Sequence, residues 1–335
     1  MQVVELPHFG PQHLRFAQRP DPRPGPREVL VRLRAASLNF RDLMMIDGTY
    51  NPRQPLPLVP LSDGAGEVVE IGAGVTRVRA GDRVAGLFSQ RWFAGKPQRD
   101  HLRSTLGGPL DGALQELWCL SEEGVSKLPD HMSFAEGATL PCAALTAWSA
   151  LVEQGGLKPG ETVLVQGTGG VSIFAMQIAH LCGARVIVTS ASDAKLERAR
   201  AMGVWQTINY LERPDWGKAA QQLSGGGVDH VVEVGGAGTL TQSLVAVRPG
   251  GHVAVIGVLT GGAGSLNLTP VLMANLRLQG VLVGHRDGFE AMTRAFDVHQ
   301  LRPAVDRQFS WREVAEALAF QRAGKHFGKV VLTID

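Results

Sequence analysis

Cysteine and tyrosine are both scarce in this chain. The 335 residues include two tyrosines and three cysteines, and the cysteines lie far apart without a C-x-x-C pair: Cys119, Cys142 and Cys182. Neither a disulfide framework nor a four-cysteine zinc site can be built from them. The formal charge is also small, +2 at pH 7, with no basic run. This charge argues against nucleic acid as a partner.

Long apolar runs are missing as well. No stretch approaches the roughly 18 apolar residues of a membrane span. The first residues, MQVVELPHFGPQ, have no basic segment leading into an apolar one. We therefore expect no membrane segment, no signal peptide and a cytoplasmic location. With 44% hydrophobic residues the chain can bury a substantial core, in two domains or one large one.

The most informative stretch lies between residues 161 and 191. An apolar run at 162–165 predicts a buried strand, the glycines of 167–170 predict a turn, and apolar spacing at 173–181 predicts a helix. A β-branched run at 185–189 predicts a second strand. This βαβ unit places a glycine loop at a helix N-terminus, where unpaired N–H groups favour a pyrophosphate. A glycine-rich turn in another doubly wound sheet is the alternative.

The loop departs from the dinucleotide fingerprint at one position. It reads Gly167-x-Gly169-x-x-Ser172, with serine in place of the third glycine of G-x-G-x-x-G. We expect the cofactor to contact this loop and the strand ends on the same side of the sheet. The residues are Thr168, Gly169, Gly170, Val171, Gly235, Gly257 and Val258.

The end of the second strand decides which dinucleotide fits. An NAD site usually has an acid about 20 residues beyond the glycines. Here Ser190 and Ser192 are neutral, and Lys195 in the next helix can reach a 2′-phosphate. We therefore predict NADP(H). Two alternatives involve Asp193, which could simply cap that helix while Lys195 is solvated, or could bind the ribose and favour NAD.

The rest of the chain shows two patterns of secondary structure. Short strands separated by glycine and proline predict an N-terminal β domain, residues 1–124, which residues 300–335 complete. Residues 125–299 predict a doubly wound α/β domain, with a parallel sheet of about six strands that alternate with helices. A last strand at 328–333 is expected to return to the N-terminal domain.

Motifs along the whole chain resemble those of the medium-chain dehydrogenase/reductase superfamily. Residues 61–68 (LSDGAGEV), 69–74 and 81–84 resemble the signature of its catalytic β domain. Residues 111–116, 140–147 and 248–251 follow in the family's order. The resemblance implies an α/β fold with a GroES-like domain and a Rossmann domain. It also implies a small-molecule substrate and a homodimer formed through an edge strand at 276–284.

The chain departs from this family at the metal positions. Zinc-dependent members supply a cysteine, a histidine and a second cysteine or acid, and the corresponding residues here are Asn39, Ser62 and Cys142. One soft ligand out of three does not hold zinc. Residues 89–110, where a structural zinc would lie, contain no cysteine. The resemblance is therefore to the zinc-free, quinone oxidoreductase-like branch, and we predict no metal.

Without zinc, a substrate that delocalises its own negative charge is favoured. Quinones and α,β-unsaturated carbonyls do so, and they need only hydrogen-bond donors from the protein. The resemblance gives Asn39 the role of polarising the acceptor carbonyl and Tyr50 that of donating a proton. Asn39 could instead cap a helix, and Tyr50 could be a packed aromatic. The resemblance also implies cofactor contacts for Thr146, Tyr210 and Lys329.

These observations predict an NADPH-dependent reductase of quinones or α,β-unsaturated carbonyls. One alternative is a zinc-independent alcohol or aldehyde oxidoreductase. Another is a non-catalytic protein that binds NADPH in a structural or sensing role.

Overall fold

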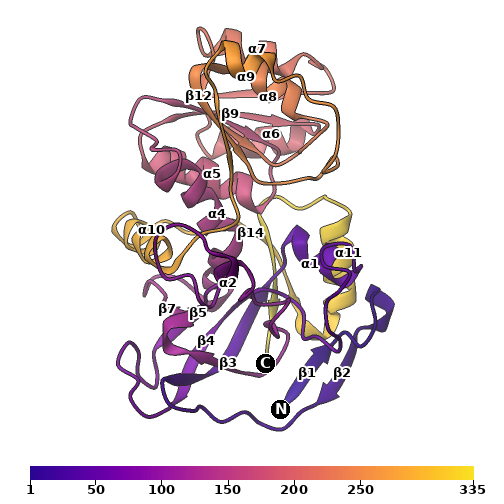
Figure 1. The fold of residues 1–335 in the computed structure, drawn as a ribbon, viewed down its shortest axis with the longest axis vertical. Helices are drawn as coiled ribbons and strands as arrows, with labels where there is room; N and C mark the ends of the chain where they lie inside the picture. Colours follow the sequence, from indigo (N-terminus) through magenta and orange to yellow (C-terminus); the bar gives the residue numbers. More distant parts are fainter. The chain divides into compact units, whose positions relative to one another are not determined.

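The computed structural model describes residues 1–335, which divide into two compact units (Figure 1). The first unit comprises Met1–Leu145 and Val283–Asp335, and the second comprises Thr146–Leu282. The boundaries expected from the sequence, after residues 124 and 299, enclose a longer second domain. The difference arises because α3 (Phe134–Gly137) packs on strands of the first unit, as does α10 (Arg286–Val298).

A seven-stranded sheet with mostly antiparallel pairs forms the first unit. Its order is β14-β15-β3-β4-β5-β7, and β6 pairs with the other half of β3. The strands are β3 (Glu28–Ser37), β4 (Asp63–Ile71), β5 (Arg83–Gly86), β6 (Leu117–Ser121), β7 (Val125–Lys127), β14 (Val305–Ser310) and β15 (Lys329–Thr333). β1 (Gln2–Glu5) and β2 (Arg15–Gln18) form a separate hairpin. The expected return of the last strand is confirmed, because β15 pairs antiparallel with β3.

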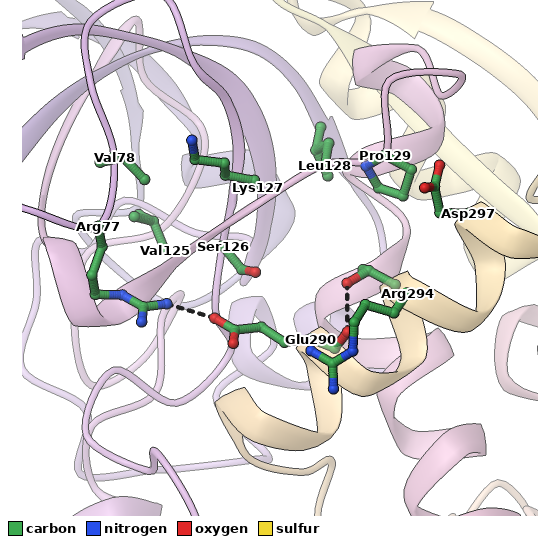
Figure 2. A pocket seen from close by; sticks show the side chains of 11 residues that line it. Arg77, Val78, Val125, Ser126, Lys127, Leu128, Pro129, Glu290, Arg294 and Asp297 are labelled. Atoms are coloured by element: carbon green, nitrogen blue, oxygen red, sulfur yellow. Dashed lines mark hydrogen bonds and ion pairs between the residues drawn. The ribbon is translucent and has the colours of Figure 1, made fainter.

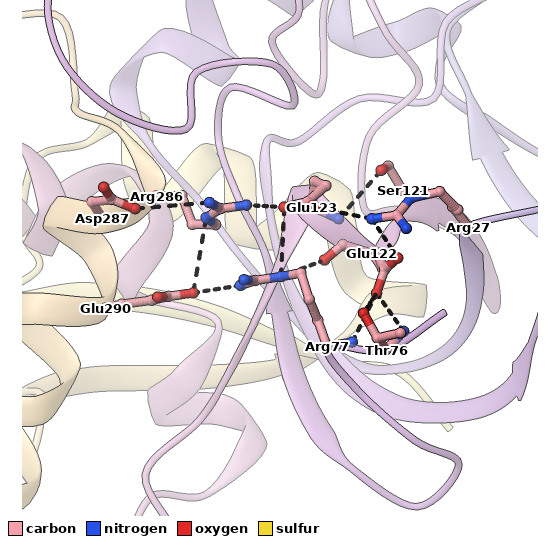
Figure 3. A network of polar contacts seen from close by, with 9 residues as sticks. All are labelled: Arg27, Thr76, Arg77, Ser121, Glu122, Glu123, Arg286, Asp287 and Glu290. Carbon is pink, nitrogen blue, oxygen red and sulfur yellow. Dashed lines mark hydrogen bonds and ion pairs between the residues drawn. The ribbon is translucent and has the colours of Figure 1, made fainter. Parts of the chain in front are cut away.

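Helices and tight turns connect these strands. They are α1 (Phe40–Ile46), α2 (Arg99–Leu102), α3, α10, α11 (Val314–Arg322), the 3-10 turns η1 (Pro11–His13), η2 (Glu122–Gly124) and η5 (Trp311–Glu313), and the π segment η3 (Leu140–Ala144). An ion network joins α10 to the turn between β6 and β7 (Figure 3). In it, Arg77 pairs with Glu290 at 2.5 Å, and Arg286 pairs with Glu123. The network fastens α10 to the first unit.

The second unit is a doubly wound sheet of six parallel strands, as predicted. The order is β10-β9-β8-β11-β12-β13. The strands are β8 (Thr162–Gln166), β9 (Arg185–Ser190), β10 (Gln206–Asn209), β11 (Val228–Glu233), β12 (Val247–Val255) and β13 (Arg277–Gly280). The helices are α4 (Leu145–Trp148), η4 (Ser149–Glu153), α5 (Gly170–Leu181), α6 (Asp193–Ala201), α7 (Trp216–Leu223), α8 (Leu240–Ala246) and α9 (Thr269–Met273). β8 and β9 are buried along almost their whole length, as their apolar runs indicate.

No helix in either unit combines the length and the apolar character that a bilayer span requires.

Candidate functional site

The glycine loop of the second unit connects β8 to the 12-residue helix α5. Gly167 has a φ of 71°, a left-handed conformation that glycine adopts without strain. A Cβ added at Gly169, the N-cap of α5, would meet no atom within 4 Å. The loop therefore leaves open space at a helix N-terminus, where the first-turn N–H groups and the helix dipole favour an anion. Thr168, Gly170 and Val171 share this N-terminus, so these residues fit a pyrophosphate.

Ser172 explains why the third glycine of the fingerprint is dispensable here. The side chain is buried, and its Oγ donates a hydrogen bond to Gln166 O at 2.7 Å. This bond ties the first turn of α5 to the end of β8. A small polar side chain thus holds the helix against the strand where a glycine would let them pack closely.

Two serines shape the turn after β9. Ser190 Oγ accepts a hydrogen bond from Ser192 N at 3.2 Å, and Ser192 Oγ accepts one from Lys195 N at 3.4 Å. Ser192 is therefore the N-cap of α6, and the alternative that Asp193 caps it is wrong. Asp193 Oδ1 accepts a hydrogen bond from Asn209 Nδ2 at 2.8 Å instead. Each serine hydroxyl can still donate its own hydrogen to a ligand.

Lys195 follows this turn along the chain, and Tyr210 reaches the turn from the end of β10. The main-chain N–H of Tyr210 donates to Ser190 O at 3.1 Å, and 41% of the tyrosine is exposed. Lys195 is half-buried in the first turn of α6. The structure thus gathers Ser190, Ser192, Lys195 and Tyr210 at the end of β9, the position where a ribose or its phosphate would lie in a doubly wound sheet.

Sequence reasoning missed a buried carboxylate, Glu233, at the end of β11. Glu233 is inaccessible to solvent, and it accepts hydrogen bonds from five groups. Oε1 binds Gly235 N at 2.8 Å, Gly236 N at 2.9 Å and Thr239 Oγ1 at 2.5 Å; Oε2 binds Gln166 Nε2 at 2.6 Å and Ser243 Oγ. An acid followed by two glycines at a strand end was the local signal that could have identified it.

Glu233 holds the strand ends that were predicted to face the cofactor. Because the N–H of Gly235 is directed to Glu233, the cofactor would meet this residue through other atoms. Gly257 lies so close to Val234 O that a side chain there would clash with it. Val258 next to it is 45% exposed, whereas Thr146, at the start of the unit, is buried.

In the first unit, three strand ends bring distant residues together. β3 ends at Ser37, which lies opposite Asp63 on β4 and Val331 on β15. Leu38 and Asn39 therefore continue between the starts of β4 and β15. This register carries Lys329 and Asn39 to the same point although 290 positions separate them.

A chain of hydrogen bonds runs through this cluster. Lys329 Nζ donates to Leu38 O and to Asn39 Oδ1, each at 2.6 Å. Asn39 Nδ2 donates to Ser62 Oγ at 3.4 Å, and Ser62 Oγ donates to Asp63 Oδ1 at 2.7 Å. Cys142 N donates to Asp63 Oδ2 at 3.1 Å. Asn39, Ser62 and Cys142, the residues that the resemblance assigns to the family's zinc positions, thus belong to one network.

Burial and charge set the protonation of this network. Burial raises the pKa of Asp63, while the Lys329 charge and hydrogen bonds from Asn39 and Ser62 act against that rise. Burial lowers the pKa of Lys329, and the charge of Asp63 opposes this change. Burial and the neighbouring Asp63 raise the pKa of the Cys142 thiol far above its usual value.

The residues of this cluster do not fit zinc. Asn39 already offers its oxygen to the Lys329 amine, and a half-buried Cys142 held as a thiol is a poor ligand. The structure also contains no group of three or more histidine, cysteine, aspartate or glutamate side chains arranged to hold a metal.

Arg41, Asp42 and Tyr50 lie close to Asn39 along the chain. Asn39 is the N-cap of α1, as the alternative to a catalytic role had it, and its main-chain N–H donates to Asp42 Oδ2 at 2.8 Å in a capping box. Its side chain also forms hydrogen bonds with Lys329 and Ser62. Burial raises the pKa of Asp42 to about 6. The Arg41 guanidinium carbon lies 5.0 Å from the Tyr50 ring centroid, and Tyr50 is 42% exposed. Arg41 thus orients a partly exposed tyrosine near the cluster.

Two cavities lie away from the glycine loop and the Lys329 cluster. One cavity of about 370 Å³ separates β7 from α10 (Figure 2), and ion pairs such as Arg77–Glu290 occupy its edge. It includes none of the predicted site residues. A second cavity of about 430 Å³ lies beside α6, β10 and α7 and includes Asp193. The glycine loop and the Lys329 cluster therefore remain the candidate sites.

Comparisons with known proteins agree with this arrangement. The alcohol dehydrogenase GroES-like domain family matches residues 25–130, and the zinc-binding dehydrogenase family matches residues 170–297. A zinc-type alcohol dehydrogenase-like protein of Schizosaccharomyces pombe is 42% identical over 92% of this chain and 92% of its own. A quinone oxidoreductase of Pseudomonas aeruginosa is 35% identical over 77% of this chain and 74% of its own.

Solved structures are similar over the full length. One described as an alcohol dehydrogenase of Sinorhizobium meliloti 1021 has a TM-score of 0.94 and 43% identity, covering 99% of this chain and 98% of that one. Another, described as an NAD-dependent alcohol dehydrogenase, has a TM-score of 0.92 and 35% identity, with complete coverage of both chains, 100% each.

Proposed function

Because this chain belongs to the medium-chain dehydrogenase/reductase superfamily, we propose that it transfers hydride from NADPH to a quinone or an α,β-unsaturated carbonyl without zinc. Membership makes it an oxidoreductase of a family that uses a nicotinamide cofactor and small-molecule substrates. The observation that carries the narrower proposal is the buried network of Asn39, Ser62, Asp63 and Lys329. Its groups bind one another, and the resemblance assigns two of these residues, Asn39 and Ser62, to the family's metal positions.

The substrate class follows from the charge that develops during reduction. A simple ketone concentrates negative charge on one oxygen, which zinc stabilises by several kcal/mol in metal-dependent enzymes. A conjugated acceptor spreads the same charge over several atoms, so hydrogen bonds suffice. Asn39 Nδ2 and the Tyr50 hydroxyl are the donors that this chain offers, the first to the acceptor carbonyl and the second as a proton source.

The second unit supports a dinucleotide. When bound, the nicotinamide supplies the hydride, and the glycine loop with Thr168, Gly169, Gly170 and Val171 would hold the pyrophosphate. Ser190 and Ser192 would donate to a 2′-phosphate, and Lys195 would provide its counter-charge. Asp193 is hydrogen-bonded to Asn209, which makes it less available for the ribose hydroxyls of NAD.

A homodimer completes the proposal. β13 is an edge strand of the parallel sheet, and exposed apolar side chains flank it along the chain: Leu268, Leu272, Met273 and Leu282. Such an edge can pair with its copy across a twofold axis. We expect a cytoplasmic particle of twice 35.8 kDa, and a monomer mass in analytical ultracentrifugation would contradict this.

The test is turnover by metal-stripped protein with NADPH or NADH against quinones, enones, enals and simple ketones. We expect NADPH-dependent reduction of the conjugated acceptors, unchanged by chelators. Tyr50→Phe should lower kcat roughly 100-fold if Tyr50 donates the proton. Lys195→Ala should lower the preference for NADPH about tenfold by removing one charge-assisted contact, whereas Lys218→Ala, on the exposed face of α7, should leave it unchanged.

Each alternative function predicts a different outcome of this assay. Steady oxidation of secondary alcohols without metal would favour an alcohol oxidoreductase. NADPH binding with no turnover of any acceptor would favour a non-catalytic role. Activity that is lost on chelation and restored by zinc would refute the argument from the Lys329 network.

A further inference from the structure

The direction of each hydrogen bond around Asn39 is fixed by its partners. An ammonium group only donates, so Lys329 Nζ requires Asn39 to accept through Oδ1. On the other side, Ser62 Oγ gives its only hydrogen to Asp63 Oδ1, so it must accept from Asn39 Nδ2. Both neighbours therefore select the same orientation of the carboxamide, with the NH₂ group away from Lys329.

We propose that Lys329 is a positioning residue for the reduction: its amine holds the Asn39 carboxamide so that Nδ2 donates to the carbonyl oxygen of the acceptor. This inference rests on the proposed function. The bond from Nδ2 to Ser62 is 3.4 Å, at the outer limit for a hydrogen bond. Nδ2 carries two hydrogens, so it can direct one towards Ser62 and Asp63 and donate the other to an oxygen that gains negative charge during hydride transfer.

The positive charge of Lys329 strengthens this donor. A cation bound to Oδ1 draws electron density from the amide, which makes the Nδ2 hydrogens more positive. The charge lies in a site where Lys329 is 3% exposed and Asp63 is inaccessible, so solvent screens it weakly. A fixed ammonium thus lies beside Asn39, and it would act on the substrate through the Asn39 amide.

The geometry opposes the other role considered for Lys329, a contact with the cofactor phosphates. Two of its three N–H bonds go to Leu38 O and Asn39 Oδ1 at 2.6 Å. A phosphate-binding lysine is normally exposed at its amine, whereas this one is buried beneath the strand ends of the first unit.

The experiment compares Lys329→Met, Asn39→Asp and the double variant. Asn39→Asp keeps the acceptor for Lys329 but lacks the N–H donor. Each single variant should lower kcat for a conjugated acceptor at least 30-fold, with the NADPH Kd within about threefold of wild type. The double variant should be no slower than the slower single variant, because both changes remove the same donor. Lys325→Met, an exposed lysine four positions earlier, is the matched control.

Two results would overturn the inference. One is a Lys329→Met variant whose NADPH Kd rises more than tenfold while kcat is retained, which would assign Lys329 to the cofactor. The other is losses that multiply in the double variant, which would make the two residues independent. Thermal unfolding of every variant identifies any that has lost its fold.

A second readout, the NMR signal of the Asn39 side-chain amide, does not depend on turnover. A wild-type protein that reduces no acceptor would therefore refute the proposed function, and the contact between Lys329 and Asn39 could still be tested. The chain has five asparagines, and selective ¹⁵N labelling gives five side-chain amide signals, of which Asn39→Asp identifies one. In Lys329→Met this signal should shift and its amide hydrogens should exchange faster with solvent. An unchanged signal would contradict the positioning role.

Discussion

Two buried carboxylates, Asp63 and Glu233, begin and end strands in the two units and are satisfied in different ways. Glu233 accepts five hydrogen bonds from neutral donors, and four of them lie within ten residues of it. Asp63 accepts from Ser62 and from Cys142 N, and its charge is balanced by Lys329. The first arrangement fastens a loop locally. The second holds a cation in place through residues far apart in the chain.

The largest loss of stability is expected when the charges of Asp63 and Lys329 no longer balance each other. Asp63→Asn leaves the Lys329 amine buried without its main counter-charge, which should lower the free energy of unfolding by about 4 kcal/mol. Adding Lys329→Met removes the unpaired cation and should recover at least about half of that loss. Chemical denaturation of the two single variants and the double variant measures both quantities. Losses that simply add would show that Asp63 and Lys329 are not coupled.

A smaller loss is expected for Glu233→Gln. Both carboxylate oxygens face donors, so the NH₂ of glutamine meets an N–H or O–H in either orientation. We expect a loss of about 2 kcal/mol. No second substitution at a single partner should restore it, because the donors are five separate groups. Glu212→Gln, in an exposed turn, should stay within about 0.5 kcal/mol of wild type. A stable Glu233→Gln protein would mean that water replaces the missing acceptor.

The contrast between Glu233, which nearby residues satisfy, and Asp63, which distant residues satisfy, also explains which features the sequence could predict. The strand at 162–165, the helix after the glycines and the strand at 185–189 appear as β8, α5 and β9, because each depends on neighbouring residues. Even Glu233 had a local sign in the Glu-Val-Gly-Gly order. Ser192, and not Asp193, is the N-cap of α6. The two residues are adjacent, and spacing alone does not decide which of them caps the helix.

The cluster in the first unit could not be predicted in this way. Asn39, Ser62, Cys142 and Lys329 were each identified individually, as a donor, two former metal positions and a possible phosphate contact. Their common network depends on β15 pairing with β3 at Val331 and Ser37, a register between segments almost 300 residues apart. The hydrogen bond from Lys329 to Asn39 is a consequence of that register, and no local pattern near Gly328 indicates it.

The smallest effect on stability is expected for a third buried cluster, in which the buried group is a base, His252. His252 Nδ1 lies 3.3 Å from His230 Nδ1, and His230 Nε2 lies 3.0 Å from Glu161 Oε2. Burial lowers the pKa of His252 from 6.5 to about 4, and the charges of Arg277 and His230 contribute in the same direction. The neutral imidazole is therefore the form that the folded chain favours.

The sign of the pH dependence follows from this lowered pKa. The unfolded chain takes up the proton first, so the stabilising contribution of His252 is complete above about pH 6.5 and is lost as the pH falls towards about 4. In His252→Gln, the difference in Tm from wild type should shrink by a few degrees over this range. The other titrating groups contribute equally to the Tm of both proteins, so their contributions cancel in that difference. His299→Gln, which is exposed, should show a constant offset. If His252→Gln also ran parallel to wild type, His252 would take up its proton at the same pH in the folded and unfolded chains. A buried cation would then be tolerated in the second unit without a carboxylate like Asp63 beside it.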